Sequence, residues 1–282
     1  MKLDIRIALA LAATAIMPLA PALAADYDPP IYVDQAPEYK PVEIGSGWYL
    51  RGDVGYILKD RIGNPGYRAF DATPPGSYSD NAFATSGIDT DVTFGAGFGY
   101  HFNDWLRADA TVEGFRGDFA GTTAGAGPCA PGLPASTGCR TEDGAKFSAI
   151  GVMANGYVDL GTYAGFTPYV GGGLGYSLVR WDNLSNTAYC TGAACPTAAA
   201  IGTSQHEGED SWRFTYALMA GVSYDISKNL KLDAGYKYRH IQGGDMFGWD
   251  SDTAAAGATG VQGRDDGFDT HEIKVGLRYD LW

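Results

Sequence analysis

Residues 92–102 read VTFGAGFGYHF, and their side chains alternate between apolar groups and small or polar ones. After a short turn at Asn103 and Asp104, residues 106–113 read LRADATVE and alternate in the same way. Successive side chains of a β-strand point to opposite faces, so strict alternation predicts a strand with one apolar and one polar face. The two segments therefore predict a pair of strands joined by a tight turn.

Six further segments continue this pattern, which gives eight expected strands. They lie at residues 47–58, 145–160, 166–180, 212–226, 230–239 and 272–282. The expected links alternate in length: 103–104, about 161–165 and 227–229 are short, whereas about 59–87, 117–144, 182–210 and 242–268 are long. Short turns at one end and long loops at the other are typical of membrane barrels.

The composition excludes several classes of protein. The chain has 282 residues, of which 40 are Gly, 45% are hydrophobic and 13% are aromatic. That much apolar surface argues against a disordered chain, and the absence of a Gly-X-Y repeat argues against a collagen-like one. The formal net charge of −13 argues against an extended surface for nucleic-acid phosphates, so no nucleic-acid partner is expected.

The N-terminal segment has the pattern of a secretory signal. Lys2 and Arg6 precede an uncharged run, and residues 22–24 read ALA, which suits cleavage before Ala25. We therefore expect a signal peptide at 1–24, Sec-type export, a Pro-rich periplasmic linker at 25–46 and one barrel domain at 47–282. A membrane-spanning anchor is the alternative, and Pro18 and Pro21 count against it.

The polar faces of the expected strands carry charges of both signs. We predict that these charges pair with one another inside a closed barrel and form a barrel-interior charge network. Its expected members are Arg51, Asp53, Asp91, Arg107, Asp109, Glu113, Arg213, Lys231, Asp233, Lys237, Arg239, Glu272, Lys274 and Arg278.

The opposite face of the same strands carries long rows of apolar, largely aromatic side chains. Whether this face contacts lipid or is buried inside the barrel decides between a membrane protein and a soluble one. An eight-stranded barrel is too narrow to bury these rows inside, and closure satisfies every backbone amide in hydrocarbon. The predicted fold is therefore all-β, an eight-stranded antiparallel transmembrane up-and-down β-barrel. Trp and Tyr near the strand ends, Trp181 among them, suit interfacial girdles. A soluble β-sandwich is the alternative.

The four cysteines lie in two of the long links. They are Cys129, Cys139, Cys190 and Cys195, and an even count in an exported chain predicts disulfides. Four cysteines allow three connectivities, and we prefer 129–139 with 190–195 because each bond closes a short loop. A metal site is the alternative, but the spacing is not that of a zinc site.

Candidate catalytic residues form no recognisable motif. The four histidines, His101, His206, His240 and His271, are scattered, and no cofactor, metal site or catalytic group is expected. An enzyme that modifies membrane lipid remains an alternative, with Ser223, Glu272 and either His240 or His271 as its triad. The aromatic residues Tyr67, Phe70, Tyr78 and Phe83 form either a contact surface or a self-packed loop, and both readings stay open.

Five short motifs resemble those of the small outer-membrane immunogenic proteins of alphaproteobacteria. They are LAADY at the export signal, GWYLRGDVGY, FGAGFGY, TPYVGGGLGY and the C-terminal EIKVGLRYDLW. Members of this group are catalogued as porin-family barrels and are similar to the OmpA/OmpX membrane barrels. The resemblance covers nearly the whole mature chain.

This resemblance implies a location, partners and a function. We expect the bacterial outer membrane, contact with outer-membrane lipid and lipopolysaccharide, and assembly by the barrel-insertion machinery. No extracellular partner can be named. The expected function is non-catalytic: envelope integrity and display of surface loops with antigen- or adhesion-like roles. A small diffusion porin is the alternative, and the predicted interior charges count against it because they would fill the barrel.

Overall fold

The computed structural model describes residues 47–130, 132–195 and 200–281; for Asp91 and Ala126 it describes the backbone alone. The expected signal peptide (1–24), the linker (25–46) and Trp282 therefore lie outside the described residues. Across the described ranges, no helix is long and apolar enough to cross a membrane.

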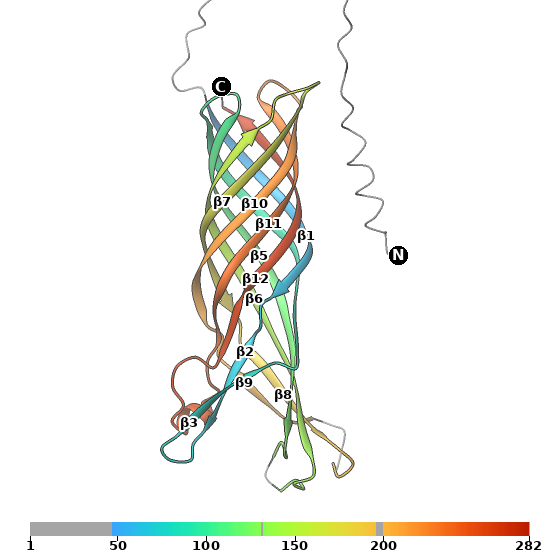
Figure 1. Ribbon diagram of the computed structural model, residues 1–282, viewed down its shortest axis with the longest axis vertical. Coiled ribbons are helices and arrows are strands. Elements are labelled where there is room, and N and C mark those ends of the chain that lie inside the picture. Colours follow the sequence, from blue (N-terminus) through green and yellow to red (C-terminus); the bar gives the residue numbers. More distant parts are fainter. Residues whose placement is uncertain (1–46, 131, 196–199, 282) are drawn as a thin grey trace, which may run out of the picture. The chain divides into compact units, whose positions relative to one another are not determined.

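Eight antiparallel strands form a closed ring (Figure 1). In ring order they are β1 (Trp48–Ile62), β4 (Thr85–His101), β5 (Leu106–Ala126), β6 (Gly138–Asp159), β7 (Phe166–Trp181), β10 (Asp210–Asp225), β11 (Leu230–Phe247) and β12 (Gly263–Asp280). Pairing of β12 with β1 closes the ring. The predicted fold class and the eight expected wall strands are confirmed.

The strands are staggered around the ring. A row of cross-strand partners that leaves β1 at Arg61 and is followed once around returns to β1 at Leu50. Such an offset requires the strands to tilt against the barrel axis, as they do in closed barrels. We refer below to the turn end, where the tight turns and Asp280 lie, and to the opposite loop end.

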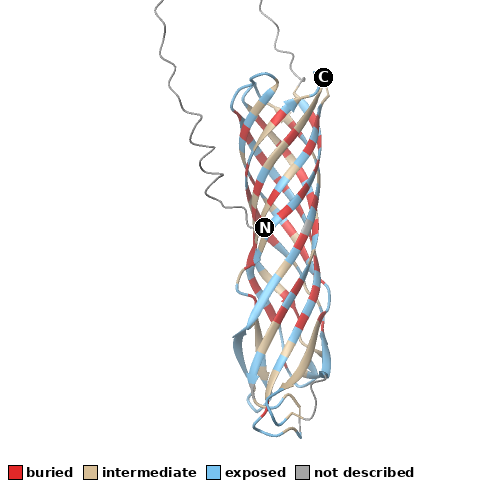
Figure 2. Cartoon of the chain, turned by 90° about the vertical axis from the view of Figure 1, so that its right-hand side faces the viewer, coloured by how far each residue is buried: buried red, intermediate tan, exposed pale blue. Residues whose placement is uncertain are grey.

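Burial alternates along each wall strand (Figure 2). On β1, Leu50, Val54 and Tyr56 are more than half exposed, whereas Tyr49 and Arg51 are at most 9% exposed. The same parity holds on β6, where Ile150 and Val152 point outward and Met153 and Tyr157 point inward. The apolar rows therefore form the outer face of the barrel, as the alternation predicts.

The predicted bounds of the long links are too wide, above all for the link at 117–144. β5 runs on to Ala126, and β6 begins at Gly138. The links also contain four short strands and a short helix: β2 (Gly66–Asp71), β3 (Ser77–Ala82), β8 (Leu184–Thr191), β9 (Ala200–His206) and α2 (Ser251–Ala255). We call these five elements, with residues 119–126 of β5 and 138–145 of β6, the loop assembly.

These strands escape prediction for a physical reason. β3 is exposed along its whole length, and β9 is exposed up to His206. A strand whose two faces both contact water has no apolar face, so its sequence shows no alternation of hydropathy.

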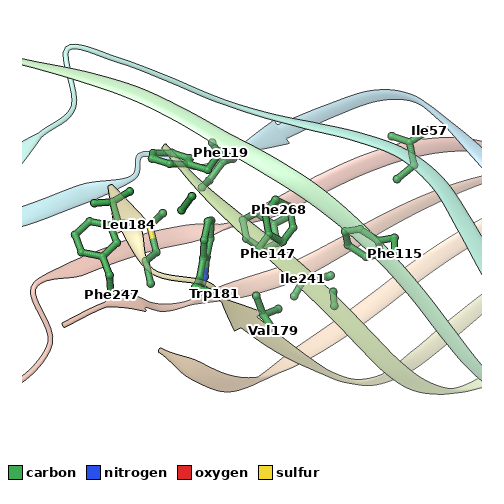
Figure 3. Packing of buried hydrophobic residues seen from close by; sticks show 14 residues of the cluster. Ile57, Phe115, Phe119, Phe147, Val179, Trp181, Leu184, Ile241, Phe247 and Phe268 are labelled. Carbon is green, nitrogen blue, oxygen red and sulfur yellow. The ribbon is translucent and has the colours of Figure 1, made fainter. Parts of the chain in front are cut away.

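An apolar cluster fills the barrel interior at the loop end (Figure 3). Phe147 stacks on Phe268 with ring centroids 5.3 Å apart, and Trp181 lies 4.9 Å from Phe147. Trp181 is only 4% exposed, so its expected place in an interfacial girdle is wrong. Trp181 alternates along β7 with the same inward positions as Ser177 and Val179. Its position along the strand, and not its aromatic ring, therefore determines which face it lies on.

Close packing inside the wall generates a test of the fold. A Cβ added at Gly175 of β7 would lie 2.1 Å from the Val152 carbonyl oxygen, whereas one added at Gly52 of β1 would meet no atom within 4 Å. We expect Gly175→Ala to lower the free energy of unfolding by about 1–3 kcal/mol, as overpacking does. Urea titration in lipid vesicles, followed by tryptophan fluorescence, measures the change. Equal stability of Gly175→Ala and the control Gly52→Ala would contradict the packing.

Candidate functional site in the barrel interior and the loop assembly

A buried carboxylate lies at the centre of the interior charge network. Glu113 on β5 accepts hydrogen bonds from Lys237, from Arg239 at 2.9 Å and from Lys274 at 3.0 Å. Arg239 also lies 3.3 Å from Glu272, which has no exposed surface. Each ion therefore faces an ion of opposite charge, which offsets part of the cost of removing it from water.

A second group of ions lies closer to the turn end. Arg51 donates to Asp53 and Asp109, each at 2.7 Å, and to the Tyr157 hydroxyl at 2.8 Å. The guanidinium of Arg107 lies 4.0 Å from the centroid of the Tyr157 ring. Aromatic rings and cations thus alternate across the lumen and fill its width.

The outer boundaries of the network are also ionic. Toward the turn end, Arg278 donates to Ser223 at 3.1 Å and lies 3.5 Å from Asp233. Toward the loop end, Arg213 donates to both carboxylate oxygens of Asp265 at 2.8 Å. The paired charges therefore extend from the turn end up to the apolar cluster, where the Arg213 guanidinium lies 5.2 Å from the centroid of the Phe268 ring.

The structure brings together most of the residues predicted for this network. Twelve of the fourteen are buried in the lumen or next to it: Arg51, Asp53, Arg107, Asp109, Glu113, Arg213, Asp233, Lys237, Arg239, Glu272, Lys274 and Arg278. Lys231 is instead half-buried at the turn end, where it pairs with Asp225 at 2.5 Å. The side chain of Asp91 lies outside the described residues.

Sequence reasoning missed two anions of the network. Asp159 on β6 pairs with Arg107 at 3.2 Å, and its inward parity could have identified it. Asp265 falls within the predicted long link 242–268, but it is 5% exposed and pairs with Arg213. On β12 the buried positions are even-numbered at Phe268 and Thr270 but odd at Asp265, and Gly267 lies between them with a φ of 117°. The alternation of inward and outward residues shifts at such a backbone irregularity, so counting along the strand gives the wrong face for the residues beyond it.

The lumen leaves almost no free space within this network. A cavity of about 10 Å³ lies between Arg51, Tyr157, Tyr169 and Lys274, which is room for about one water molecule. Beyond it, toward the loop end, the apolar cluster around Phe147 closes the lumen. The interior is thus a packed core, as expected for a barrel of eight strands.

The triad considered for an enzyme is not assembled. Ser223 is fully buried inside the barrel, where it donates to Asp233. His240 and His271 lie on the opposite, outer face of the wall, where they contact Asp269 and Tyr236. The wall therefore separates the hydroxyl from both imidazoles.

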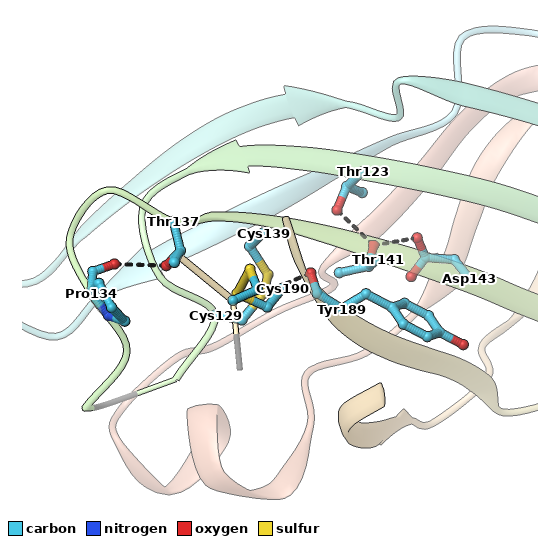
Figure 4. The surroundings of a disulfide bond; sticks show 10 residues. Thr123, Cys129, Pro134, Thr137, Cys139, Thr141, Asp143, Tyr189 and Cys190 are labelled. Atoms are coloured by element: carbon cyan, nitrogen blue, oxygen red, sulfur yellow. Dashed lines mark hydrogen bonds between the residues drawn. A yellow bond between two sulfur atoms is a disulfide. The ribbon is translucent and has the colours of Figure 1, made fainter. Parts of the chain in front are cut away.

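Two disulfides lie on one side of the loop assembly, and Figure 4 shows the surroundings of the Cys129–Cys139 bond. They join Cys129 to Cys139 and Cys190 to Cys195. Cys139 on β6 and Cys190 on β8 are cross-strand partners, so one cysteine of each bond lies at the same level of the β6–β8 pair. Each bond closes a short loop: the first at the tip of the β5–β6 hairpin and the second in the link between β8 and β9.

Hydrogen bonds hold the strands of this region together on the barrel side of the disulfides. β8 pairs with β6 from Gly138 to Gly144 and with β9 on its other side. Asp143 on β6 accepts hydrogen bonds from Thr141 at 2.8 Å and from Asn186 of β8 at 2.5 Å. Burial raises the pKa of the Asp143 carboxyl above its ordinary value. This half of the loop assembly is therefore an ordered sheet that continues the barrel wall.

The other half joins the first and last long links. The rings of Phe70 and Tyr78 have centroids 5.0 Å apart, and Trp249 lies 6.0 Å from Tyr78. Trp249 donates from its indole nitrogen to the Thr259 carbonyl at 3.2 Å, and the Thr259 amide donates to the Tyr78 hydroxyl at 3.0 Å. Phe70 and Tyr78 therefore pack on the last link, and Tyr78 stays 38% exposed. Tyr67 and Phe83 instead pack against the apolar cluster.

The buried ion cluster predicts a large effect of removing its central anion. In Glu113→Gln, three buried cations lose their shared carboxylate, so we expect the free energy of unfolding to fall by about 3–5 kcal/mol. Glu142→Gln is the matched control, because Glu142 and its partner Arg140 are 51% and 45% exposed. We expect less than about 1 kcal/mol for the control. Urea titration in lipid vesicles measures both, and similar losses would contradict the assignment of Glu113 as the centre.

The packed lumen predicts that the barrel does not conduct. Purified protein refolded into a planar bilayer is expected to give no steady conductance steps, because ions and rings fill the lumen. A wide porin inserted by the same protocol serves as the positive control. Reproducible steps from this protein alone would show that the interior opens in a membrane.

Comparisons with known proteins identify a family and several relatives with similar sequences. The sequence model described as "Outer membrane protein beta-barrel domain" matches residues 7–280. An uncharacterized protein of Brucella abortus is 37% identical and aligns over 88% of this chain and 90% of the relative. A protein of Rickettsia bellii named "Putative adhesin" is 26% identical, with 83% and 88% covered. The outer membrane protein PagN of Salmonella typhimurium is 27% identical, with 62% and 73% covered.

Solved structures are also similar. The Neisserial surface protein A covers 84% of this chain and 98% of its own, with 17% identity and a TM-score of 0.43. The protein described here is located in the outer membrane. With the family match across nearly its whole length, the chain belongs to the outer membrane protein β-barrel family.

Proposed function

We propose that this protein is a non-catalytic outer-membrane barrel that presents the loop assembly as an adhesion-like surface. The observation that carries this proposal is the contrast between its two ends. The lumen is closed by ions and rings, whereas β5 and β6 continue as ordered strands beyond the wall. One disulfide closes the β5–β6 hairpin, and a second closes the link between β8 and β9. A transport role would need an open lumen, while a binding role needs a rigid exposed surface.

The placement of the loop assembly supports this function. Long loops of bacterial outer-membrane barrels face the cell exterior and short turns face the periplasm. The loop end is therefore the surface that another cell meets. Relatives in Rickettsia carry the name of an adhesin, which supports the same proposal.

A structural contribution to the envelope belongs to this proposal. The ion network and the apolar cluster join strands from all sides of the ring, so the barrel is a rigid anchor. A rigid anchor keeps the loop assembly in a fixed orientation, which lowers the entropic cost of binding a partner.

Adherence of bacteria to cultured epithelial cells tests the proposal. A non-adherent laboratory strain that produces the wild-type protein is expected to adhere above the level of the empty strain. Replacement of residues 185–205 by a short Gly-Ser linker is expected to abolish the gain, because it removes the β8–β9 pair.

The matched control replaces residues 161–164, a tight turn at the opposite end. It should leave adherence unchanged, and a mobility shift on heating should confirm a folded barrel in each strain. Wild-type adherence at the empty-strain level, or full adherence without residues 185–205, would refute the proposal.

A further inference from the structure

Three cations lie together on the outer face of the wall, next to the loop assembly. Arg116 on β5, Ser148 on β6 and Arg180 on β7 form one row of cross-strand partners. Lys146 points to the same face two residues before Ser148. Neighbouring strands are about 4.8 Å apart, so the backbones of the two arginines are about 10 Å apart. Their long side chains can therefore reach one group that lies over the short side chain of Ser148.

A hollow on the outer face includes this row and extends from it toward the turn end, where its lining becomes apolar. The next outward positions on the same strands are Gly114, Ile150 and Leu178. Because Gly114 has no side chain, the wall is recessed there, and the hollow also reaches Phe94 and Val112. The whole hollow, including the part lined by the cations and by carboxylates, has a volume of about 1270 Å³. On a wall that faces lipid, a recess of this kind has room for an acyl chain.

The row coincides with the edge of the apolar wall. On β6 the outward residues on the turn side of Ser148 are Ile150 and Val152, which are 53% and 52% exposed. On its loop side the outward residue is Lys146. Since the loop end faces the exterior, this edge lies at the headgroups of the outer leaflet.

We propose that Arg116, Lys146 and Arg180 bind a phosphate group of an acylated, phosphorylated sugar lipid of the outer leaflet. One acyl chain of that lipid lies in the hollow over Gly114. Arginine guanidinium groups bind phosphate oxygens in pairs, and the Ser148 hydroxyl adds a donor between them. The site recognises a lipid that combines phosphate with acyl chains at the membrane surface.

Four carboxylates lie near the row: Asp210 beside Arg180, and Asp89, Asp118 and Asp182 in the lining of the hollow. Arg180 pairs with Asp210, and Lys146 pairs with Asp118, but all four side chains are more than half exposed. Exposed ion pairs contribute little to stability, so both cations can exchange a carboxylate for a phosphate at small cost. No acidic side chain lies within ion-pair distance of Arg116 among the residues whose side chains are described.

Titration of the refolded full barrel with diphosphoryl lipid A tests this site. Native mass spectrometry of detergent complexes counts bound lipid and gives its affinity. The double variant R116A/R180A is expected to bind lipid A at least about tenfold more weakly, because it loses charge-assisted hydrogen bonds. Arg264→Ala is the matched control, since Arg264 is outward and 69% exposed on β12, away from the row, and it should bind like the wild type.

The hollow is tested separately with Gly114→Leu. A Cβ at Gly114 would make only ordinary contacts, the nearest at 3.6 Å, so the barrel should fold and the side chain should fill the recess. This variant is expected to bind lipid A more weakly as well. A heat-dependent mobility shift verifies folding of every variant, and R116K/R180K provides a milder change at the same positions.

Two further arms distinguish the source of the phosphate. Lipid A without its phosphates and phosphatidylglycerol are both expected to bind more weakly than diphosphoryl lipid A, and millimolar inorganic phosphate should not displace the bound lipid. Unchanged affinity in R116A/R180A, or equal affinity for the phosphate-free lipid, would overturn the proposal. Phosphatidylglycerol binding as tightly as lipid A would reduce the row to a general anionic surface, and unchanged affinity in Gly114→Leu would remove the acyl chain from the hollow.

Discussion

The structure depends on one constraint, the hydrogen bonding of the backbone in hydrocarbon. Each amide group of a membrane-crossing strand needs a partner in the protein, because lipid offers none. Pairing of β12 with β1 meets this demand by closing the ring. Closure then assigns every side chain of the wall to lipid or to lumen, since alternate residues point to opposite sides. The oily outer face and the charged inner face are both consequences of that single requirement.

A lumen enclosed by eight strands is narrow, so its side chains must fit and pair as they do in a soluble core. Glu113 meets three cations there, and Arg213 meets both oxygens of Asp265. Such pairing costs nearly as much desolvation as it returns in attraction, so its value lies in fixing one arrangement of the strands more than in added stability. With the lumen filled, recognition is left to the two remaining surfaces, the loop assembly and the lipid-facing wall.

Most of the wall and of its interior charge network could be predicted from the sequence. Whether a residue has an odd or an even position along its strand tells which face of the wall it lies on. The same rule explains what was missed. Trp181 has inward parity, and it is expected at the lipid interface only if its aromatic character is given more weight than its position. Asp265 could not be found, because the irregularity at Gly267 changes which residues are buried. β8 and β9 could not be found either, since strands without an apolar face carry no periodic signal.

The register breaks share a location, and this explains where prediction stops. Pairing shifts between Ile57 and Lys59 on β1 and between Thr90 and Thr93 on β4, near the loop end of the wall. Bulges bend strands and increase their twist, which redirects them as they leave the ring. Strict alternation of apolar and polar residues is required only where a strand crosses the lipid. Outside the bilayer, strands can contain bulges and can be polar on both faces. The boundary of the bilayer is therefore also the boundary of what hydropathy can predict, and the loop assembly, where recognition is proposed, lies beyond it.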